Sequence, residues 1–148
     1  MSVIASFQGK YRWLSNFVPA RVEFEGLAFP TVEHAYQATK TYSAVERMEI
    51  MGCSSPGRAK RVGQTVLLRA NWEDVKYGIM LELLRQKFED PEMARRLLAT
   101  GDSILIEGNH WHDCEWGVCM CLSCGGVGRN MLGELLMRVR MELGGKEQ

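Results

Sequence analysis

Residues 29–40 read Phe-Pro-Thr-Val-Glu-His-Ala-Tyr-Gln-Ala-Thr-Lys, which is a helix start followed by several polar side chains. Thr31 is a residue type that caps helix N-termini, and neither Gly nor Pro occurs in residues 32–51. We therefore expect one long helix over residues 32–51.

Polar side chains follow one edge of this expected helix. Glu33, Gln37 and Lys40 stand at positions i, i+4 and i+7, so a helix would line them up. One interpretation is an acid, an amide and an amine that point into one pocket. The other is a solvated stripe, in which Glu33 and Lys40 stabilise the helix by about 0.2–0.5 kcal/mol at most. Spacing alone favours the stripe, because charged stripes are common on helices.

Short strands are expected before this helix and further helices after it. Residues 21–25 alternate polar and apolar side chains, and residues 27–29 follow Gly26, which predicts a β-hairpin. Apolar periodicity and capping residues predict four more helices, and apolar runs predict two more short strands. The helices are expected over residues 58–62, 71–88, 90–100 and 130–143, with Gly144 and Gly145 ending the last, and the strands over residues 3–7 and 103–107.

The composition is that of an ordinary globular protein. The chain has 148 residues, 46% of them apolar and 24% charged, and 18 basic residues balance 18 acidic ones. This length suits one domain, residues 1–148, of the α+β class, predominantly α-helical with a small β element. Zero net charge argues against a whole-surface basic field for nucleic acid, and no apolar run is long enough for a membrane helix. We see no export signal at the N-terminus and expect a cytoplasmic protein.

Residues 107–117 form a second polar segment, directly after an expected buried strand. Loops that leave such strands often carry binding groups. Indole rings can stack on a base, and carboxylates can orient water or stabilise a developing cation. Alternatively, the two tryptophans anchor the core and the acids cap turns; the residues alone do not decide between these interpretations. The segment contains Glu107, Asn109, His110, Trp111, His112, Asp113, Glu115, Trp116 and Gly117.

Four of the five cysteines lie close together, within this segment and just after it. Cys119, Cys121 and Cys124 form a CxCxxC pattern, with Cys114 and two histidines nearby. Four tetrahedral nitrogen and sulfur ligands could be assembled from these residues, as in a small zinc-binding adaptor. Zinc sites usually pair two separated knuckles, however, and a second knuckle is missing. We therefore favour reduced, free cysteines that behave as small hydrophobic residues, and we expect no metal and no cofactor.

The segments described so far, taken in this order, resemble the NADAR (YbiA-like) family. The matching stretches cover nearly the whole chain, and the helix motif and the Asp-x-x-Trp-Gly loop are the most specific of them. They are Phe7 with Gly9, residues 14–17, residues 29–40, Ala59-Lys60 with Gly63, residues 105–107 with Asn109, Trp111 with Asp113 and Trp116-Gly117, and Gly128 with Asn130, Leu132-Gly133, Leu136-Met137 and Arg140.

The resemblance implies a compact, mainly helical domain with N-glycosidase activity. Members of the family are linked to hydrolysis of N-ribosyl bonds. The implied substrates are small and nucleotide-like: phosphorylated early intermediates of riboflavin synthesis, or ADP-ribose attached to guanine, including guanine in nucleic acid. A non-catalytic reader of NAD or ADP-ribose is the alternative from a different class of function. The cysteine loop is expected to be a feature of one branch rather than of the family.

The resemblance also suggests roles for individual residues. Glu33 and Asp113 are expected to face one cleft and to share the carboxylate tasks, stabilising the sugar cation and activating water or protonating the leaving base. A second route would use Lys40 as a nucleophile that passes through a Schiff base. Trp116 is expected to stack on the leaving base. The other expected substrate-binding residues are Ser15, Asn16, Gln37, Glu107, Asn109 and Gly117.

Overall fold

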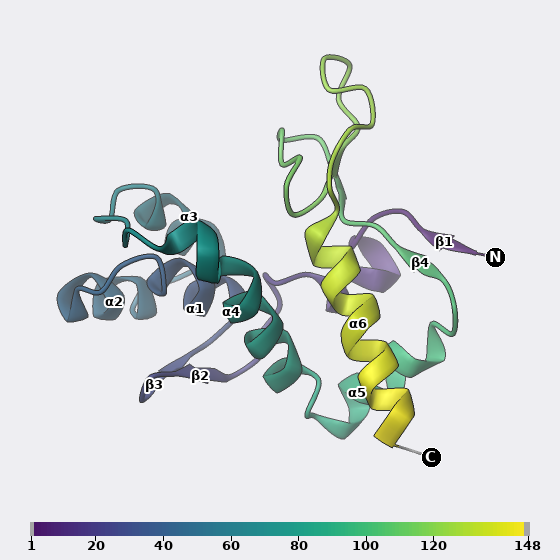
Figure 1. The fold of residues 1–148 in the computed structure, drawn as a ribbon, viewed down its shortest axis with the longest axis horizontal. Helices are drawn as coiled ribbons and strands as arrows, with labels where there is room; N and C mark the ends of the chain where they lie inside the picture. Colours follow the sequence, from purple (N-terminus) through teal and green to yellow (C-terminus); the bar gives the residue numbers. More distant parts are fainter. Residues whose placement is uncertain (1, 147–148) are drawn as a thin grey trace. The chain divides into compact units, whose positions relative to one another are not determined.

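The structure is a computed structural model that describes residues 2–146 (Figure 1). Its residues group into two compact units. The central unit is Asn16–Lys87, and the flanking unit combines Met1–Ser15 with Phe88–Gln148. Both units contain helices and only short strands, so the predicted class, α+β and predominantly helical, is confirmed. The expectation of a single domain stays a prediction.

The central unit opens with the predicted β-hairpin. Strands β2 (Val22–Phe24) and β3 (Leu27–Phe29) pair in antiparallel fashion, with Val22 opposite Phe29. The two turn residues, Glu25 and Gly26, have φ angles of 47° and 83°. A two-residue turn with both φ angles positive has the twist that a tight hairpin needs.

The predicted single helix over residues 32–51 is wrong, because the structure has two helices there. Helix α1 (Val32–Ala38) ends before Thr39, whose hydroxyl donates to the Tyr36 carbonyl at 2.6 Å. Helix α2 (Ala44–Met51) begins after Ser43, whose side chain accepts from the backbone N–H of Glu46. Short hydroxyl side chains therefore compete with the helical hydrogen bonds and split the helix without any Gly or Pro.

Helix α1 is the centre of this unit, and all seven of its residues are buried. It contacts α2, α3 (Pro56–Gly63) and α4 (Trp72–Lys87), as well as β2 and β3 (Figure 1). Helices α3 and α4 lie within about two residues of the predicted bounds. Because every side of α1 faces protein, its polar side chains have an interior environment and not the solvated one of a surface stripe.

The flanking unit joins the start of the chain to its second half. Strand β1 (Val3–Ile4) pairs in parallel with β4 (Ile104–Leu105), and a 3-10 helix, η1, follows at Gly9–Leu14. Helix α5 (Pro91–Ala99) and β4 both contact α6 (Met131–Lys146). The predicted strands and the α5 helix are thus confirmed.

Two details of this unit differ from the expectations. Helix α6 runs to Lys146, so the predicted stop at Gly144 and Gly145 is wrong. Glycine weakens a helix by about 1 kcal/mol relative to alanine, but it does not force an end as proline does. In addition, the expected loop after residue 107 contains two short parallel strands, β5 (Gly108–Asn109) and β6 (Val118–Cys119). Among residues 2–146, none of the helices has the length and apolar character that crossing a membrane requires.

Candidate active site

The start of α1 is fixed by Thr31 and His34. The Thr31 hydroxyl oxygen accepts from the backbone N–H of His34 at 3.0 Å and lies 2.7 Å from its Nδ1. The other ring nitrogen, Nε2, lies 3.0 Å from the carbonyl oxygen of Cys53. A carbonyl oxygen can only accept, so Nε2 carries the proton in this bond. Both nitrogens of His34 are therefore used to hold α1 in place.

Glu33 and Gln37 form a buried pair on α1. Their exposed fractions are 7% and 3%, and Gln37 Nε2 donates to Glu33 Oε1 at 2.7 Å. Because a carboxylate can only accept, this bond fixes the orientation of the amide and leaves Gln37 Oε1 without a partner. The expectation that these two side chains share one edge is confirmed, and burial excludes the solvated stripe for both.

Asn16 joins this pair through its backbone. Its carbonyl oxygen accepts from the Glu33 N–H at 3.2 Å, and its side chain is only 7% exposed. Side-chain Nδ2 donates to the sulfur of Met80 at 3.5 Å, but Oδ1 has no partner. Two buried amide oxygens, one on each neighbour of Glu33, therefore lack donors, and each such group costs about 1–3 kcal/mol. A ligand that donates hydrogen bonds would remove this cost.

Gly63 of α3 packs directly against the Gln37 side chain. A Cβ atom at position 63 would overlap Gln37 Oε1 and would lie 2.8 Å from Cδ. Only glycine lets α3 approach α1 this closely. The Ala59-x-x-x-Gly63 spacing is thus explained by packing, since Ala59 is also fully buried.

Lys40 does not continue the edge formed by Glu33 and Gln37, and the i+7 alignment is wrong. Because α1 ends at Ala38, Lys40 lies in the connection to α2, where its N–H donates to the Gln37 carbonyl at 3.2 Å. Lys40 is half-buried, and its Nζ lies 5.6 Å from the centre of the Tyr36 ring. This cation–π contact holds the side chain beside α1.

In the flanking unit, Asn109 organises the loop between β5 and β6. Its Nδ2 donates to Glu107 Oε2 at 3.0 Å and to the Asp113 carbonyl at 2.9 Å. Its Oδ1 accepts from the N–H groups of Trp111 and Asp113, both at 3.2 Å. With 1% of its side chain exposed, Asn109 is a buried scaffold for the residues around it.

Asp113 and Trp116 lie in the turn that Asn109 supports. Asp113 Oδ1 accepts from the N–H groups of Trp116 at 2.8 Å and Glu115 at 3.2 Å, which is the turn-capping role considered above. The carboxylate is half-buried, as is the Trp116 side chain. Trp111 is 50% exposed and is not a core anchor, so that part of the structural interpretation is wrong.

Gly117 completes this cluster. A Cβ at this position would overlap Glu107 and would lie 2.7 Å from Asn109 Nδ2. The loop thus brings together five of the residues predicted from the sequence, which are Glu107, Asn109, Asp113, Trp116 and Gly117. Ser15 is half-buried at the end of η1, where its N–H donates to the Arg12 carbonyl at 2.8 Å. The expectation that Glu33 and Asp113 face one cleft stays a prediction.

Two residues have structural features that sequence reasoning missed. Asn130 adopts a φ of 54°, and its amide group donates to the Leu105 carbonyl at 2.8 Å and accepts from the Glu107 N–H at 3.0 Å. Asparagine before a helix is a signal for this left-handed conformation. In α4, burial lowers the pKa of Lys87 to about 7. No sequence signal marks Lys87, because lysine counts as polar in periodicity arguments.

The chain is similar in sequence and in structure to known proteins. The profile of the NADAR domain matches residues 5–144. N-glycosidase YbiA of Escherichia coli strain K12 is 40% identical over 136 residues, which cover 90% of this chain and 82% of that protein. Riboflavin biosynthesis protein VVA0006 of Vibrio vulnificus is 34% identical over 134 residues, which cover 88% of this chain and 35% of that protein. The NMR structure of E. coli YbiA matches with a TM-score of 0.84 and 37% identity, covering 99% of this chain and 87% of that one.

The contact between Gly63 and Gln37 can be tested by a double-mutant cycle. We expect Gly63→Ala to lower the free energy of unfolding by about 1–3 kcal/mol, because the new methyl group displaces Gln37. In a Gln37→Ala background the same change is expected to cost less, because only the Cβ of residue 37, 3.0 Å from the new methyl group, remains of the Gln37 atoms that it meets. Urea unfolding measures both. Gly57→Ala in the same helix is the control, since a Cβ there meets only Ser55 Oγ at 4.0 Å. Equal costs of Gly63→Ala in both backgrounds would contradict this packing.

The role of Asn109 predicts a large effect of an almost isosteric change. Asn109→Asp replaces a donor with a carboxylate oxygen 3.0 Å from Glu107 Oε2, so we expect a loss of at least about 2 kcal/mol in unfolding free energy at pH 7. Asn71→Asp is the matched control, because Asn71 uses Oδ1 to accept from Arg69 and Tyr42 and an aspartate keeps both bonds. Thermal unfolding measures the stability of both variants. If Asn109→Asp and Asn71→Asp unfold at the same midpoint temperature, Asn109 is not a scaffold for the loop.

Proposed function

This chain belongs to the NADAR family, and on that basis we propose that it hydrolyses the N-ribosyl bond of a small, nucleotide-like substrate. The expected enzyme class, a hydrolase of N-glycosyl bonds, is confirmed by the relatives named N-glycosidase. Two substrate classes are proposed: ribosylaminopyrimidine phosphates of riboflavin synthesis, in line with the name of the V. vulnificus relative, and ADP-ribose linked to guanine. The observation that carries the proposal is the buried Glu33–Gln37 pair with its unpartnered amide oxygens.

Glu33 fits the charge that this reaction creates. Breaking an N-glycosidic bond builds positive charge on the sugar ring, and a carboxylate at the ring stabilises that charge or activates the attacking water. The carboxylate of Glu33 is buried, so its field is little screened by solvent. Its Oε1 is held by Gln37 Nε2 at 2.7 Å, which fixes its direction before substrate binds.

The amide oxygens beside Glu33 fit the substrate's hydroxyl groups. Gln37 Oε1 and Asn16 Oδ1 are both buried acceptors without donors. A ribose ring carries hydroxyl groups that donate hydrogen bonds, so its binding would satisfy oxygens that the protein leaves unpaired. Sites of this kind reject analogues that lack the hydroxyl, because the buried groups then stay unpaired.

Asp113 and Trp116 are proposed for the remaining tasks. Asp113 would supply the second carboxylate, and Trp116 would stack on the base as it leaves. The two backbone N–H groups bound to Asp113 Oδ1 hold that carboxylate in one orientation. In this proposal Glu107, Asn109 and Gly117 act by shaping the loop, and Ser15 adds a hydroxyl at the end of η1.

Glu33→Gln and Asp113→Asn test the two carboxylates. Each replacement keeps a carbonyl oxygen for the hydrogen bonds that Glu33 Oε1 and Asp113 Oδ1 accept. We therefore expect a folded protein, checked by thermal unfolding, and a drop in turnover of roughly 10²–10⁴-fold. Ribosylaminouracil phosphate and ADP-ribosylated guanosine are the two substrates, with mass detection of the freed base or sugar. Glu49→Gln and Asp102→Asn are controls on exposed acids. A wild-type rate in either variant would show that its carboxylate takes no part in the mechanism. If the wild-type protein binds the substrates without cleaving them, the non-catalytic reader is favoured instead.

The Lys40 route makes a separate prediction. If the amine attacks the anomeric carbon, the C–N bond to the base breaks and the base leaves with a proton. The ribosylamine formed on Lys40 then opens its sugar ring: the bond from the anomeric carbon to the ring oxygen breaks, the oxygen takes a proton, and an iminium adduct remains on Lys40. Borohydride would reduce that adduct, and the mass of the protein would rise by the trapped sugar phosphate. We expect no trapping in Lys40→Ala. Lys10→Ala is the matched control, because Lys10 Nζ also lies over a tyrosine ring, 5.1 Å from its centre. Full turnover in Lys40→Ala would end the covalent route.

A further inference from the structure

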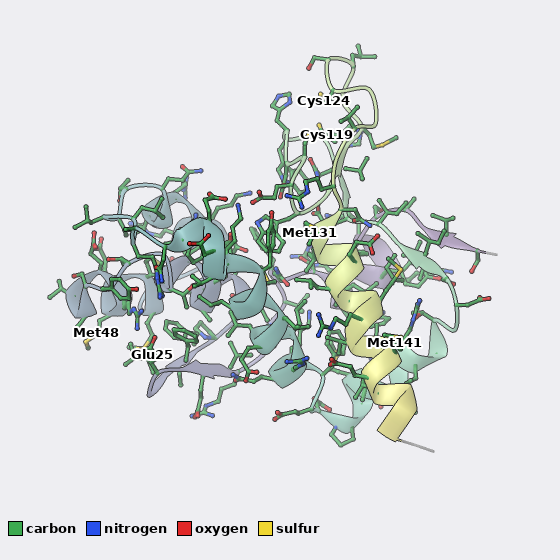
Figure 2. The ribbon with its side chains drawn as sticks, viewed as in Figure 1. Glu25, Met48, Cys119, Cys124, Met131 and Met141 are labelled. Atoms are coloured by element: carbon green, nitrogen blue, oxygen red, sulfur yellow. The ribbon has the colours of Figure 1, made fainter. Side chains whose placement is uncertain are left out.

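The loop that follows the Asp113 turn ends in a cluster of sulfur atoms that the proposed reaction does not use. Figure 2 shows Cys119 and Cys124 on this loop, beyond Met131 at the start of α6. Four side chains there each offer one potential ligand atom, and these four atoms lie within 4.8 Å of one another. The residues are His112, Cys119, Cys121 and Cys124. We infer that these four residues bind one zinc ion in a closed structural site.

The distances from the His112 ring nitrogen to the three sulfur atoms are close to those of a tetrahedral site. With Zn–S bonds of about 2.3 Å and a Zn–N bond of about 2.0–2.1 Å, ligand atoms at the corners of a tetrahedron lie about 3.6–3.8 Å apart. His112 Nδ1 lies 3.4 Å from Cys124 Sγ, 3.5 Å from Cys121 Sγ and 4.0 Å from Cys119 Sγ. Small side-chain rotations would bring these atoms into the coordination sphere of one ion.

The backbone around the cysteines is arranged as in a zinc knuckle. The Cys121–Cys124 turn closes with Gly125 N–H donating to the Cys121 carbonyl at 2.8 Å, and Gly125 has a φ of 66°. The Cys124 N–H donates to Cys121 Sγ at 3.4 Å. Cys119 belongs to β6 and pairs with Val127 across the base of the turn. The bond from the Cys124 N–H holds the Cys121 sulfur in one orientation, as hydrogen bonds to ligating side chains do in metal sites.

His112 completes the set from the other side of the loop. Its φ of 69° is in the left-handed region, which is uncommon for residues other than glycine. In this conformation its N–H donates to Cys119 Sγ at 3.3 Å and its ring faces Cys121 and Cys124. A single histidine, His112, therefore supplies the ligand that a second knuckle would provide. The lack of a second knuckle in the sequence is thus no argument against a metal site.

The surroundings favour a structural over a catalytic metal. Four protein ligands leave no open position for water or substrate. Leu122, Met120 and Val127 are exposed, so the tip of the loop has little apolar core of its own, and short segments of this kind are often held by metal. Cys114 lies outside the four-residue set.

Metal content tests this inference independently of enzyme activity. Protein produced with added zinc and purified under reducing conditions is expected to contain about one zinc per chain by elemental analysis, and cobalt exchange should give the visible spectrum of tetrahedral thiolate-bound cobalt. We expect Cys121→Ser and His112→Ala to lose at least tenfold in zinc affinity, measured by competition with a chromogenic chelator.

The controls are Cys53→Ser in the central unit and Cys114→Ser next to the set, both of which should keep one zinc. Circular dichroism of every variant shows whether the helices remain folded, and hydrogen exchange of the wild-type loop should rise when a chelator removes the metal. Absence of zinc and of tetrahedral cobalt from the wild type, iron with sulfide in place of zinc, or a disulfide that forms under the same reducing conditions would each overturn the inference. Loss of zinc in Cys114→Ser would overturn the assignment of the four ligands.

Discussion

The hydrogen bond between Gln37 Nε2 and Glu33 Oε1 is the contact on which the candidate site depends. A buried carboxylate is costly unless a donor stabilises it, and here the donor lies one turn along the same helix. Gln37 can hold this position only because Gly63 leaves room for its side chain. The cap at Thr31, the tight approach of α3 and the burial of α1 therefore all serve one pair of side chains.

Elements specified by neighbouring residues were predictable from the sequence. The hairpin, the cap at Thr31 and the Asp90–Pro91 start of α5 follow from local preferences, and the structure confirms each of them. The break after Ala38 was missed because hydroxyl side chains made it, and a search for Gly and Pro does not detect such competition. The end of α6 differs for another reason: Gly144 and Gly145 weaken the helix but do not end it.

The candidate site was predictable only where its spacing is that of a helix. Positions i and i+4 were enough to pair Glu33 with Gln37. The approach of Gly63 to Gln37 and the meeting of His112 with the cysteines depend on the path of the chain between them, which spacing does not encode. Lys40 was misplaced because its position depended on the length of α1.

The parallel pairing of β1 with β4 has a consequence for the order of folding. This pairing joins residues 3–4 to residues 104–105, so one small sheet closes a loop of about a hundred residues. The central unit, by contrast, is a continuous segment that the ribosome completes first. Contacts between residues so far apart in the sequence form late. We therefore expect the helices around α1 to assemble before β4 has been synthesised and can pair with β1.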